Sequence, residues 1–187
     1  MQLHGTVRPD TPLLVVALDL EAGELGDRLP LLITGVGKVR AAVAVSTLLA
    51  QERPSQVINL GTAGGLRHGL DGIHEVGVVM QHDFDSDAIE HTTGLAFGPP
   101  IVLGHGPTLA TGDRFVQGGP LRDALEQRAD LVDMEGYAVA AACRMADVPV
   151  RLVKLVSDDA DEHALTNWVD SVRDHARTLA HWVHDHL

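Results

Sequence analysis

Acidic side chains follow several apolar runs of this sequence, at points where they could transfer protons. Asp158 follows Ser157 after the apolar residues 150–156, Glu21 closes the segment Ala-Leu-Asp-Leu-Glu, and Glu135 precedes an alanine-rich segment. A carboxyl group held within hydrogen-bonding distance of a reacting atom can act as a general acid or base. Taken alone, Glu135 is more typical of a helix cap or of a first-turn acid that complements the helix dipole, and Asp158 could also be a cap.

Two glycine-rich segments also follow apolar runs. In residues 59–65, Asn-Leu-Gly-Thr-Ala-Gly-Gly, the glycines let backbone amides approach a ligand closely, although a flexible turn has the same composition. Residues 35–38, Gly-Val-Gly-Lys, lack the leading glycine spacing of a nucleotide triphosphate loop and the Ser or Thr that would bind magnesium. We therefore expect a ligand contact at residues 59–65 and a tight strand-to-helix turn at residues 35–38.

Neither metal nor thiol chemistry is expected. His175, His181, His184 and His186 crowd the last segment, but their spacing puts them on more than one helical face and no acid completes a known metal signature. Cys143 is the only cysteine, and its alanine-rich surroundings are typical of a small core residue. A single cysteine allows no intrachain disulfide and fits a reducing compartment, so we expect a cytoplasmic protein without metal or cofactor.

Length, composition and charge limit the classes of function. The chain has 187 residues, of which 45% are apolar and 21% charged, so we expect one globular domain over residues 1–187. Its 14 Lys and Arg against 26 Asp and Glu give a net charge of -12, which argues against binding to a nucleic-acid backbone. No run of about 18 apolar residues and no amino-terminal stretch of signal length occurs, so neither membrane insertion nor export is expected.

The apolar pattern predicts strands that alternate with helices. The strand candidates are residues 13–18, 31–34, 56–60, 75–80, 101–103, 131–133 and 150–156, with a polar, Gly- and Pro-rich stretch at 82–100. The helix candidates are residues 38–52, 120–128, 135–146 and a final amphipathic segment carrying Leu165, Trp168, Val169, Val172, Leu179 and Val183. This order indicates a single α/β domain with a twisted, mostly parallel central sheet flanked by helices. Ligands of such folds bind at the carboxyl ends of the strands, where the acids and glycines fall.

Five segments, taken in order, carry a resemblance that covers the chain from about residue 13 to its end. They are residues 34–39 (Thr-Gly-Val-Gly-Lys-Val), 59–65, 111–116 (Thr-Gly-Asp-Arg-Phe-Val), 132–136 (Val-Asp-Met-Glu-Gly) and 153–158 (Val-Lys-Leu-Val-Ser-Asp). Together they resemble the purine nucleoside and uridine phosphorylase superfamily, particularly its hydrolytic branch, the methylthioadenosine/S-adenosylhomocysteine nucleosidases. The resemblance implies a nucleoside phosphorylase-like fold, a homodimer, and cleavage of the N-glycosidic bond of a purine nucleoside.

The resemblance also implies which residues contact the substrate. Met134 and Glu135 would hold the ribose, with Glu135 accepting hydrogen bonds from its hydroxyls. Phe115 would stack on the base, and the backbone of Val116 would meet the base edge. The remaining expected substrate contacts are Ala63 and Gly64 of the glycine segment and Ser157.

Two acids are the expected catalytic residues. Asp158, supported by Ser157, would share a proton with N7 of the departing base, and Glu21 would orient the attacking water, because the segment at 17–21 resembles the family's Ala-Met-Glu-Glu-Glu. Glycosidic cleavage passes through an oxocarbenium-like sugar, so carboxylates near the sugar and an acid at the base stabilise the two separating halves. Asp19 competes with Glu21 for the water, since on a regular strand the two would share a face.

Water is the expected acceptor of the sugar. A phosphorylase must bind a phosphate dianion, yet the glycine segment is followed by no basic residue until Arg67. Lys154 and Arg114 keep a phosphate-dependent phosphorylase open as an alternative, and a catalytically inactive nucleoside-binding module is another. The retained acids argue against that module, because a binder needs no proton donor. The segment after Glu21 is short for the family, which leaves the 5′ substituent open between methylthioadenosine-like and futalosine-like compounds.

Overall fold

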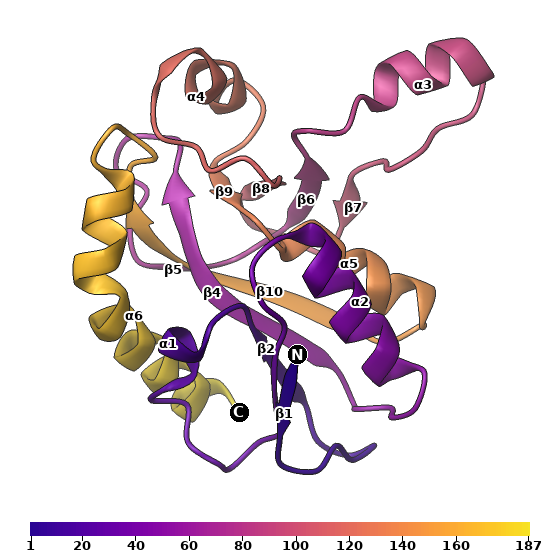
Figure 1. Ribbon diagram of the computed structural model, residues 1–187, viewed down its shortest axis with the longest axis vertical. Coiled ribbons are helices and arrows are strands. Elements are labelled where there is room, and N and C mark those ends of the chain that lie inside the picture. Colours follow the sequence, from indigo (N-terminus) through magenta and orange to yellow (C-terminus); the bar gives the residue numbers. More distant parts are fainter.

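A mixed, 10-stranded sheet runs through the computed structural model of this chain (Figure 1). The structure describes the backbone of residues 1–187 and the side chains of residues 1–164 and 173–187. The strands are β1 (Gln2–His4), β2 (Leu13–Val16), β3 (Leu31–Ile33), β4 (Val57–Gly65), β5 (Ile73–Glu75), β6 (Val78–Gln81), β7 (Ile101–Val102), β8 (Thr108–Thr111), β9 (Leu131–Asp133) and β10 (Val150–Asp158). The helices are α1 (Asp19–Ala22), α2 (Lys38–Leu49), α3 (Ser86–Thr93), α4 (Gly119–Glu126), α5 (Gly136–Met145) and α6 (Ala164–His186).

The sheet consists of two parallel blocks. β3, β2, β4 and β10 form one block, and β6, β8 and β9 form the other. The blocks join where Gly64 and Gly65 at the end of β4 pair antiparallel with Val132 and Leu131 of β9. β1, β5 and β7 add antiparallel strands to β3, β10 and β6. Because β4 meets β9 through its last residues, the carboxyl ends of both blocks lie close together.

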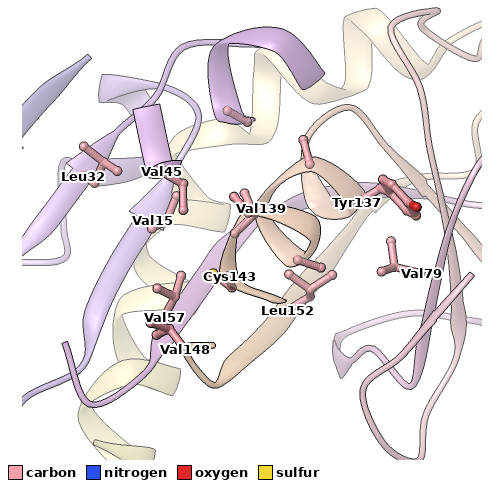
Figure 2. Close-up of a cluster of buried hydrophobic side chains, with 14 of the residues drawn as sticks. Val15, Leu32, Val45, Val57, Val79, Tyr137, Val139, Cys143, Val148 and Leu152 are labelled. Carbon is pink, nitrogen blue, oxygen red and sulfur yellow. The ribbon is translucent and has the colours of Figure 1, made fainter. Parts of the chain in front are cut away.

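Helices cover both faces of the larger block. In Figure 1, α2 and α5 lie together on one side of the strands, while α1 and α6 lie on the other. The first side encloses an apolar core that includes Val15, Val45, Val139 and Leu152 (Figure 2). A second core on the other side contains Leu14, Ile58, Val153 and Leu179 among its members. Every residue of β2 is buried, as the continuous apolar run predicts for a strand covered on both faces.

The expected α/β class, with helices flanking a mostly parallel sheet, is confirmed, and several element boundaries are corrected. The strand predicted at 75–80 is two strands, β5 and β6, because the chain turns between them. The polar stretch at 82–100 contains α3, which projects from the body at the end of an arm (Figure 1). β1, α1 and β8 have at most four residues each and were not predicted. The strand predicted at 56–60 continues through the glycine segment to residue 65.

The last helix is α6, as its apolar spacing predicts. Leu179 and Val183 of that stripe are buried against the sheet, whereas Leu165, Trp168, Val169 and Val172 fall outside the described side chains. Within the described part of the chain, no helix combines the length and the hydrophobicity that crossing a membrane requires.

Candidate active site

The carboxyl ends of the two parallel blocks enclose a cavity of about 250 Å³. Its walls come from β4 and from the segments at the ends of β2, β3, β8, β9 and β10. The structure brings together here all of the site residues expected from the sequence, which are Glu21, Ala63, Gly64, Phe115, Val116, Met134, Glu135, Ser157 and Asp158. Acids that are far apart in the chain therefore line one common cavity.

Glu135 turns away from the helix that it precedes. It is the N-cap residue of α5, yet its side chain makes no capping hydrogen bond. Its Oε1 instead accepts a 2.7 Å hydrogen bond from the backbone N–H of Gly37, and the residue is 9% exposed. Asp133 supplies the cap, because its Oδ2 accepts a 2.8 Å hydrogen bond from the N–H of Gly136. The interpretation of Glu135 as a helix cap is therefore wrong.

A buried ion pair lies beside the cavity wall. The ammonium nitrogen of Lys154 is 2.9 Å from Oδ2 of Asp133 and donates a 2.8 Å hydrogen bond to Oδ1 of Asn59. Oδ1 of Asp133 accepts a 2.6 Å hydrogen bond from the hydroxyl of Thr111. Charges removed from water in this way are stabilised only when they are paired and hydrogen-bonded. Lys154 is thus bound within the protein and is not presented to a phosphate ion.

The short helix α1 determines which of Glu21 and Asp19 faces the cavity. Two residues apart on a helix, their side chains point roughly 200° apart, so the expectation that they share a face is wrong. Asp19 is exposed, whereas Glu21 is 5% exposed and lines the cavity. Oε2 of Glu21 accepts hydrogen bonds of 3.1 and 3.0 Å from the N–H groups of Ala17 and Leu18. The helix therefore aims one acid inward and leaves the other in solvent.

An irregularity in β10 brings Ser157 and Asp158 to the same cavity. Val156 pairs with Ala63 and Asp158 pairs with Gly64, so Ser157 is an extra residue in the pairing with β4. Consecutive residues of a regular strand point to opposite faces, and a bulge of this kind changes that alternation. The hydroxyl of Ser157 donates a 2.7 Å hydrogen bond to Oδ2 of Asp158. The N–H of Ala160 donates a 2.9 Å hydrogen bond to Oδ1, which fixes the carboxyl group.

The glycines of residues 61–65 make room for these acids. A Cβ atom on Gly61 would lie 3.2 Å from Oε1 of Glu21, and one on Gly64 would lie 3.2 Å from Oδ1 of Asp158. Both positions belong to β4, so the alternative of a flexible turn is wrong. The absence of side chains lets the carboxyl groups approach the strand.

Apolar side chains that line the cavity remain partly uncovered. Phe115 is 43% exposed and Val36 is 42% exposed, although both line the cavity. Val116, the next residue along the chain, is buried at 5% exposure. Apolar surface next to a few convergent polar groups is typical of a small-molecule site.

Burial is the main cause that raises the pKa values of two acids at this site. Burial raises the pKa of Glu21, and Lys154 opposes that effect only in part. For Glu135, burial and the neighbouring charge of Asp133 raise the pKa to about 8, again against the attraction of Lys154. Burial alone would lower the pKa of the Lys154 ammonium, but Asp133 and the two glutamates raise it instead. The cluster therefore favours the charged form of Lys154 and disfavours the charged forms of Glu21 and Glu135.

The ion pair between Lys154 and Asp133 was not predicted from the sequence. The lysine within the apolar run 150–156 does indicate a buried pair, because a lysine is almost never buried without a partner. The partner could not be read from the sequence, since Asp133 lies on a different strand.

The chain matches the family model described as the Phosphorylase superfamily over residues 3–107 and 86–185. It is similar to the 5'-methylthioadenosine/S-adenosylhomocysteine nucleosidase of Bacillus thuringiensis (strain Al Hakam), with 30% identity over 182 residues that cover 80% of this chain and 77% of the relative.

Two solved structures share the fold. One is the 5'-methylthioadenosine/S-adenosylhomocysteine nucleosidase from Helicobacter pylori with butyl-thio-DADMe-Immucillin-A, with a TM-score of 0.83, 20% identity, and coverage of 94% of this chain and 97% of that chain. The other is the native futalosine hydrolase of Helicobacter pylori strain 26695, with a TM-score of 0.82, 20% identity, and coverage of 94% and 96%. At these identities the likeness concerns the fold alone.

Replacing one partner of the buried ion pair should destabilise the fold more than replacing both partners. We expect Lys154→Met to lower the free energy of unfolding by about 3–5 kcal/mol, because Asp133 would keep an unpaired buried charge. The double variant Asp133→Asn with Lys154→Met should recover at least half of that loss. Urea denaturation measures the free energy of unfolding of the wild type, of Lys154→Met and of the double variant. Arg151→Met is the control, because the pair of Arg151 with Glu75 is partly exposed and contributes about 1 kcal/mol or less. A double variant that is no more stable than Lys154→Met would contradict this account.

The raised pKa of Glu135 predicts a pH-dependent stability. The pKa is about 8 in the folded protein against 4.5 for the ordinary group, so folding favours the protonated form. Its stabilising contribution is complete below the lower value and is lost as the pH rises through about 8. Between about pH 5 and about pH 9, the wild-type free energy of unfolding should therefore fall relative to that of Glu135→Gln, as measured by urea denaturation.

Glu75→Gln is the matched control for this titration. The hydrogen bond from Arg151 lowers the pKa of Glu75, so that side chain stays ionised and gives no such slope over the same pH range. A constant difference between wild type and Glu135→Gln would show that Glu135 is ionised throughout.

Proposed function

The chain belongs to the phosphorylase superfamily and, within it, to the branch of the 5'-methylthioadenosine/S-adenosylhomocysteine nucleosidases, and from this premise we propose that residues 1–187 form one domain that hydrolyses the N-glycosidic bond of an adenosine-type nucleoside. The observation that carries the proposal is the convergence of Glu21, Glu135 and Asp158 on one cavity. Its volume of about 250 Å³ suits a small organic ligand. The products are the free base and the sugar.

The sugar occupies the side of the cavity that carries Glu135. Positive charge grows on the ribose as the glycosidic bond breaks, and a carboxylate that accepts hydrogen bonds from the ribose hydroxyls stabilises that charge. The hydrogen bond from Gly37 holds one oxygen of Glu135 in place and leaves the other for the sugar. Met134 lies beside the same ribose. Phe115 contacts the base, and the backbone of Val116 meets its edge.

Asp158 delivers a proton to N7 of the leaving base. The electron pair of the broken bond moves into the base, so a proton at N7 neutralises the charge that develops there. Ser157 orients the acid through the 2.7 Å hydrogen bond. A positioned acid of this kind contributes about 10²–10⁴-fold to the rate.

Glu21 orients and deprotonates the attacking water. The water oxygen forms the new bond to the sugar carbon, and its proton passes to the carboxylate. A raised pKa makes Glu21 a stronger base than an exposed glutamate, and two backbone N–H groups fix its orientation.

Water, and not phosphate, is the acceptor that this cavity favours. Glu21, Asp133, Glu135 and Asp158 all line it, and their negative charge opposes the entry of a phosphate dianion. Lys154 is already paired with Asp133. Among the described residues that line the cavity, Arg114 is the one basic side chain, whereas four are acidic.

A homodimer is the assembly we propose, formed through the outer face of α2. Val39 and Val43 are 73% and 61% exposed and stand one helical turn apart. The chain carries 26 acidic residues, yet α2 contains none, so this helix, which carries Lys38 and Arg40, is a strip without negative charge on an acidic surface. Val36, just before α2, lines the cavity, so a second copy on this face would lie close to the site.

We also propose that the protein works in the cytoplasm. Its single cysteine, Cys143, is a buried free thiol, and burial raises the pKa of that thiol to about 12. Such a cysteine serves packing, and a chain without disulfides suits a reducing compartment.

Turnover tests the proposed chemistry directly. Adenosine, methylthioadenosine, S-adenosylhomocysteine and futalosine are incubated with the protein, and the released base is measured by chromatography with and without phosphate. We expect cleavage that does not depend on phosphate and a loss of about 10²–10⁴-fold in kcat for Asp158→Asn, because that variant lacks the proton donor. Glu75→Gln should retain wild-type turnover. A strict phosphate requirement would make the protein a phosphorylase, and binding without base release would make it an inactive module.

The oligomeric state tests the proposed dimer. The double variant Val39→Asp with Val43→Asp should sediment as a monomer, because facing aspartates would repel each other at the interface. Leu20→Asp, on the opposite side of the sheet, should leave the mass unchanged. A wild-type protein that is monomeric at micromolar concentration would refute the proposal.

A further inference from the structure

Two segments that lead into the cavity wall are tied together outside the cavity by one carboxylate from a third segment. The Lys38 ammonium group forms an ion pair with Oδ1 of Asp83, and the backbone N–H of Asp113 donates a 2.8 Å hydrogen bond to Oδ2. The backbone N–H of Lys38 donates a further 2.8 Å hydrogen bond to Oδ1 of Asp113. Lys38 follows β3, Asp83 follows β6 and Asp113 follows β8. These three residues are called the clasp below.

The clasp adjoins both functional walls of the cavity. Lys38 directly follows Gly37, whose N–H binds Glu135, and Val36, which lines the cavity. Asp113 directly precedes Arg114, which is followed by the apolar Phe115 and Val116, and all three line the cavity. Asp83 itself lines no part of this cavity. It can therefore affect a ligand only through the loops that it holds.

Glycines allow the three loops to approach this closely. Gly37 has a φ of 98°, and a Cβ atom there would lie 3.0 Å from Oδ1 of Asp113. A Cβ atom on Gly112 would lie 2.3 Å from the imidazole ring of His82, the neighbour of Asp83. The close contacts of the clasp therefore explain the glycines in both segments, Gly-Val-Gly-Lys and Thr-Gly-Asp.

The electrostatics favour a persistent contact. The side chains of Lys38 and Asp83 are only 17% and 19% exposed, so solvent screens their charges less than it screens an open surface pair. Burial alone would raise the pKa of Asp83, but the hydrogen bonds from Lys38 and from the amide of Asp113 outweigh it and lower the pKa. The carboxylate thus stays charged around neutral pH. Lys38 also donates a 3.0 Å hydrogen bond to Oε1 of Gln81, the last residue of β6.

We propose that Lys38, Asp83 and Asp113 are positioning residues for nucleoside cleavage, and this inference rests on the proposed function of the cavity. By fixing the two loops relative to each other, the clasp sets the distance between the ribose-binding Glu135 and the base-binding Phe115. The contact of Phe115 with the base and the hydrogen bonds of Glu135 to the ribose hydroxyls already exist in the bound substrate, so the clasp contributes mainly to the binding that substrate and transition state share. Losing such uniform binding raises KM more than it lowers kcat.

Kinetics of three variants tests this assignment. Asp83→Asn leaves a single side-chain oxygen to accept hydrogen bonds from both the Lys38 ammonium group and the N–H of Asp113. Lys38→Met removes the ammonium group. For each we expect KM to rise about 10-fold or more while kcat falls by less than about 3-fold. Lys38→Arg keeps the charge and should stay within about 3-fold of wild type in KM. Glu75→Gln, which breaks a partly exposed ion pair away from the cavity, should leave both constants unchanged.

Hydrogen exchange provides a readout that needs no turnover. In Asp83→Asn the backbone amides of residues 35–38 and 112–116 should exchange faster together, while those of β2 and β4 keep their protection. The clasp is refuted if neither loop changes, or if KM stays at the wild-type value in both Asp83→Asn and Lys38→Met. If wild type cleaves no nucleoside, the proposed function fails, and the exchange of the two loops still decides whether the clasp holds them.

Discussion

One buried ammonium group beside three buried carboxyl groups is the constraint on which this site depends. Lys154 pairs with Asp133, and its charge also acts on Glu21 and Glu135. A single positive charge cannot balance three negative ones in a region of low dielectric, so the charged forms of Glu21 and Glu135 are disfavoured and their pKa values are raised. Such a cluster favours partners that bring positive charge, and an oxocarbenium-like sugar is a partner of that kind.

The sheet explains how the cluster forms. Lys154 of β10 pairs with Gly61 of β4, and the missing side chain at Gly61 leaves space for both the ammonium group and Glu21. Asp133 reaches the same point because β9 crosses the end of β4, where the two parallel blocks join. The junction of the blocks is thus also the place where the charges meet. A shift in the pairing of β4 with β10 by one residue would turn Lys154 to the opposite face.

Some of this site could be predicted from the sequence, and the rest depends on contacts between distant segments. Apolar runs followed by acids or glycines indicate the carboxyl ends of buried strands, and parallel topology places such ends at one edge. Asp19 and Glu21 could not be distinguished, because the four-residue helix that separates their directions is too short to give a periodic pattern. Glu135 resembles a cap in sequence, and only the distant Gly37 shows otherwise. Nothing in the sequence indicated a role for Asp83, because its partners Lys38 and Asp113 lie on other segments.

A crystal structure with a non-hydrolysable adenosine analogue tests the central claim most directly, namely that acids from distant segments act on one nucleoside. We expect the base beside Phe115 with its N7 within hydrogen-bonding distance of Asp158, and the ribose hydroxyls within the same distance of Glu135. An ordered water between Glu21 and the anomeric carbon should complete the arrangement. An analogue bound elsewhere, or one bound in this cavity with Asp158 and Glu135 facing away from it, would contradict the account.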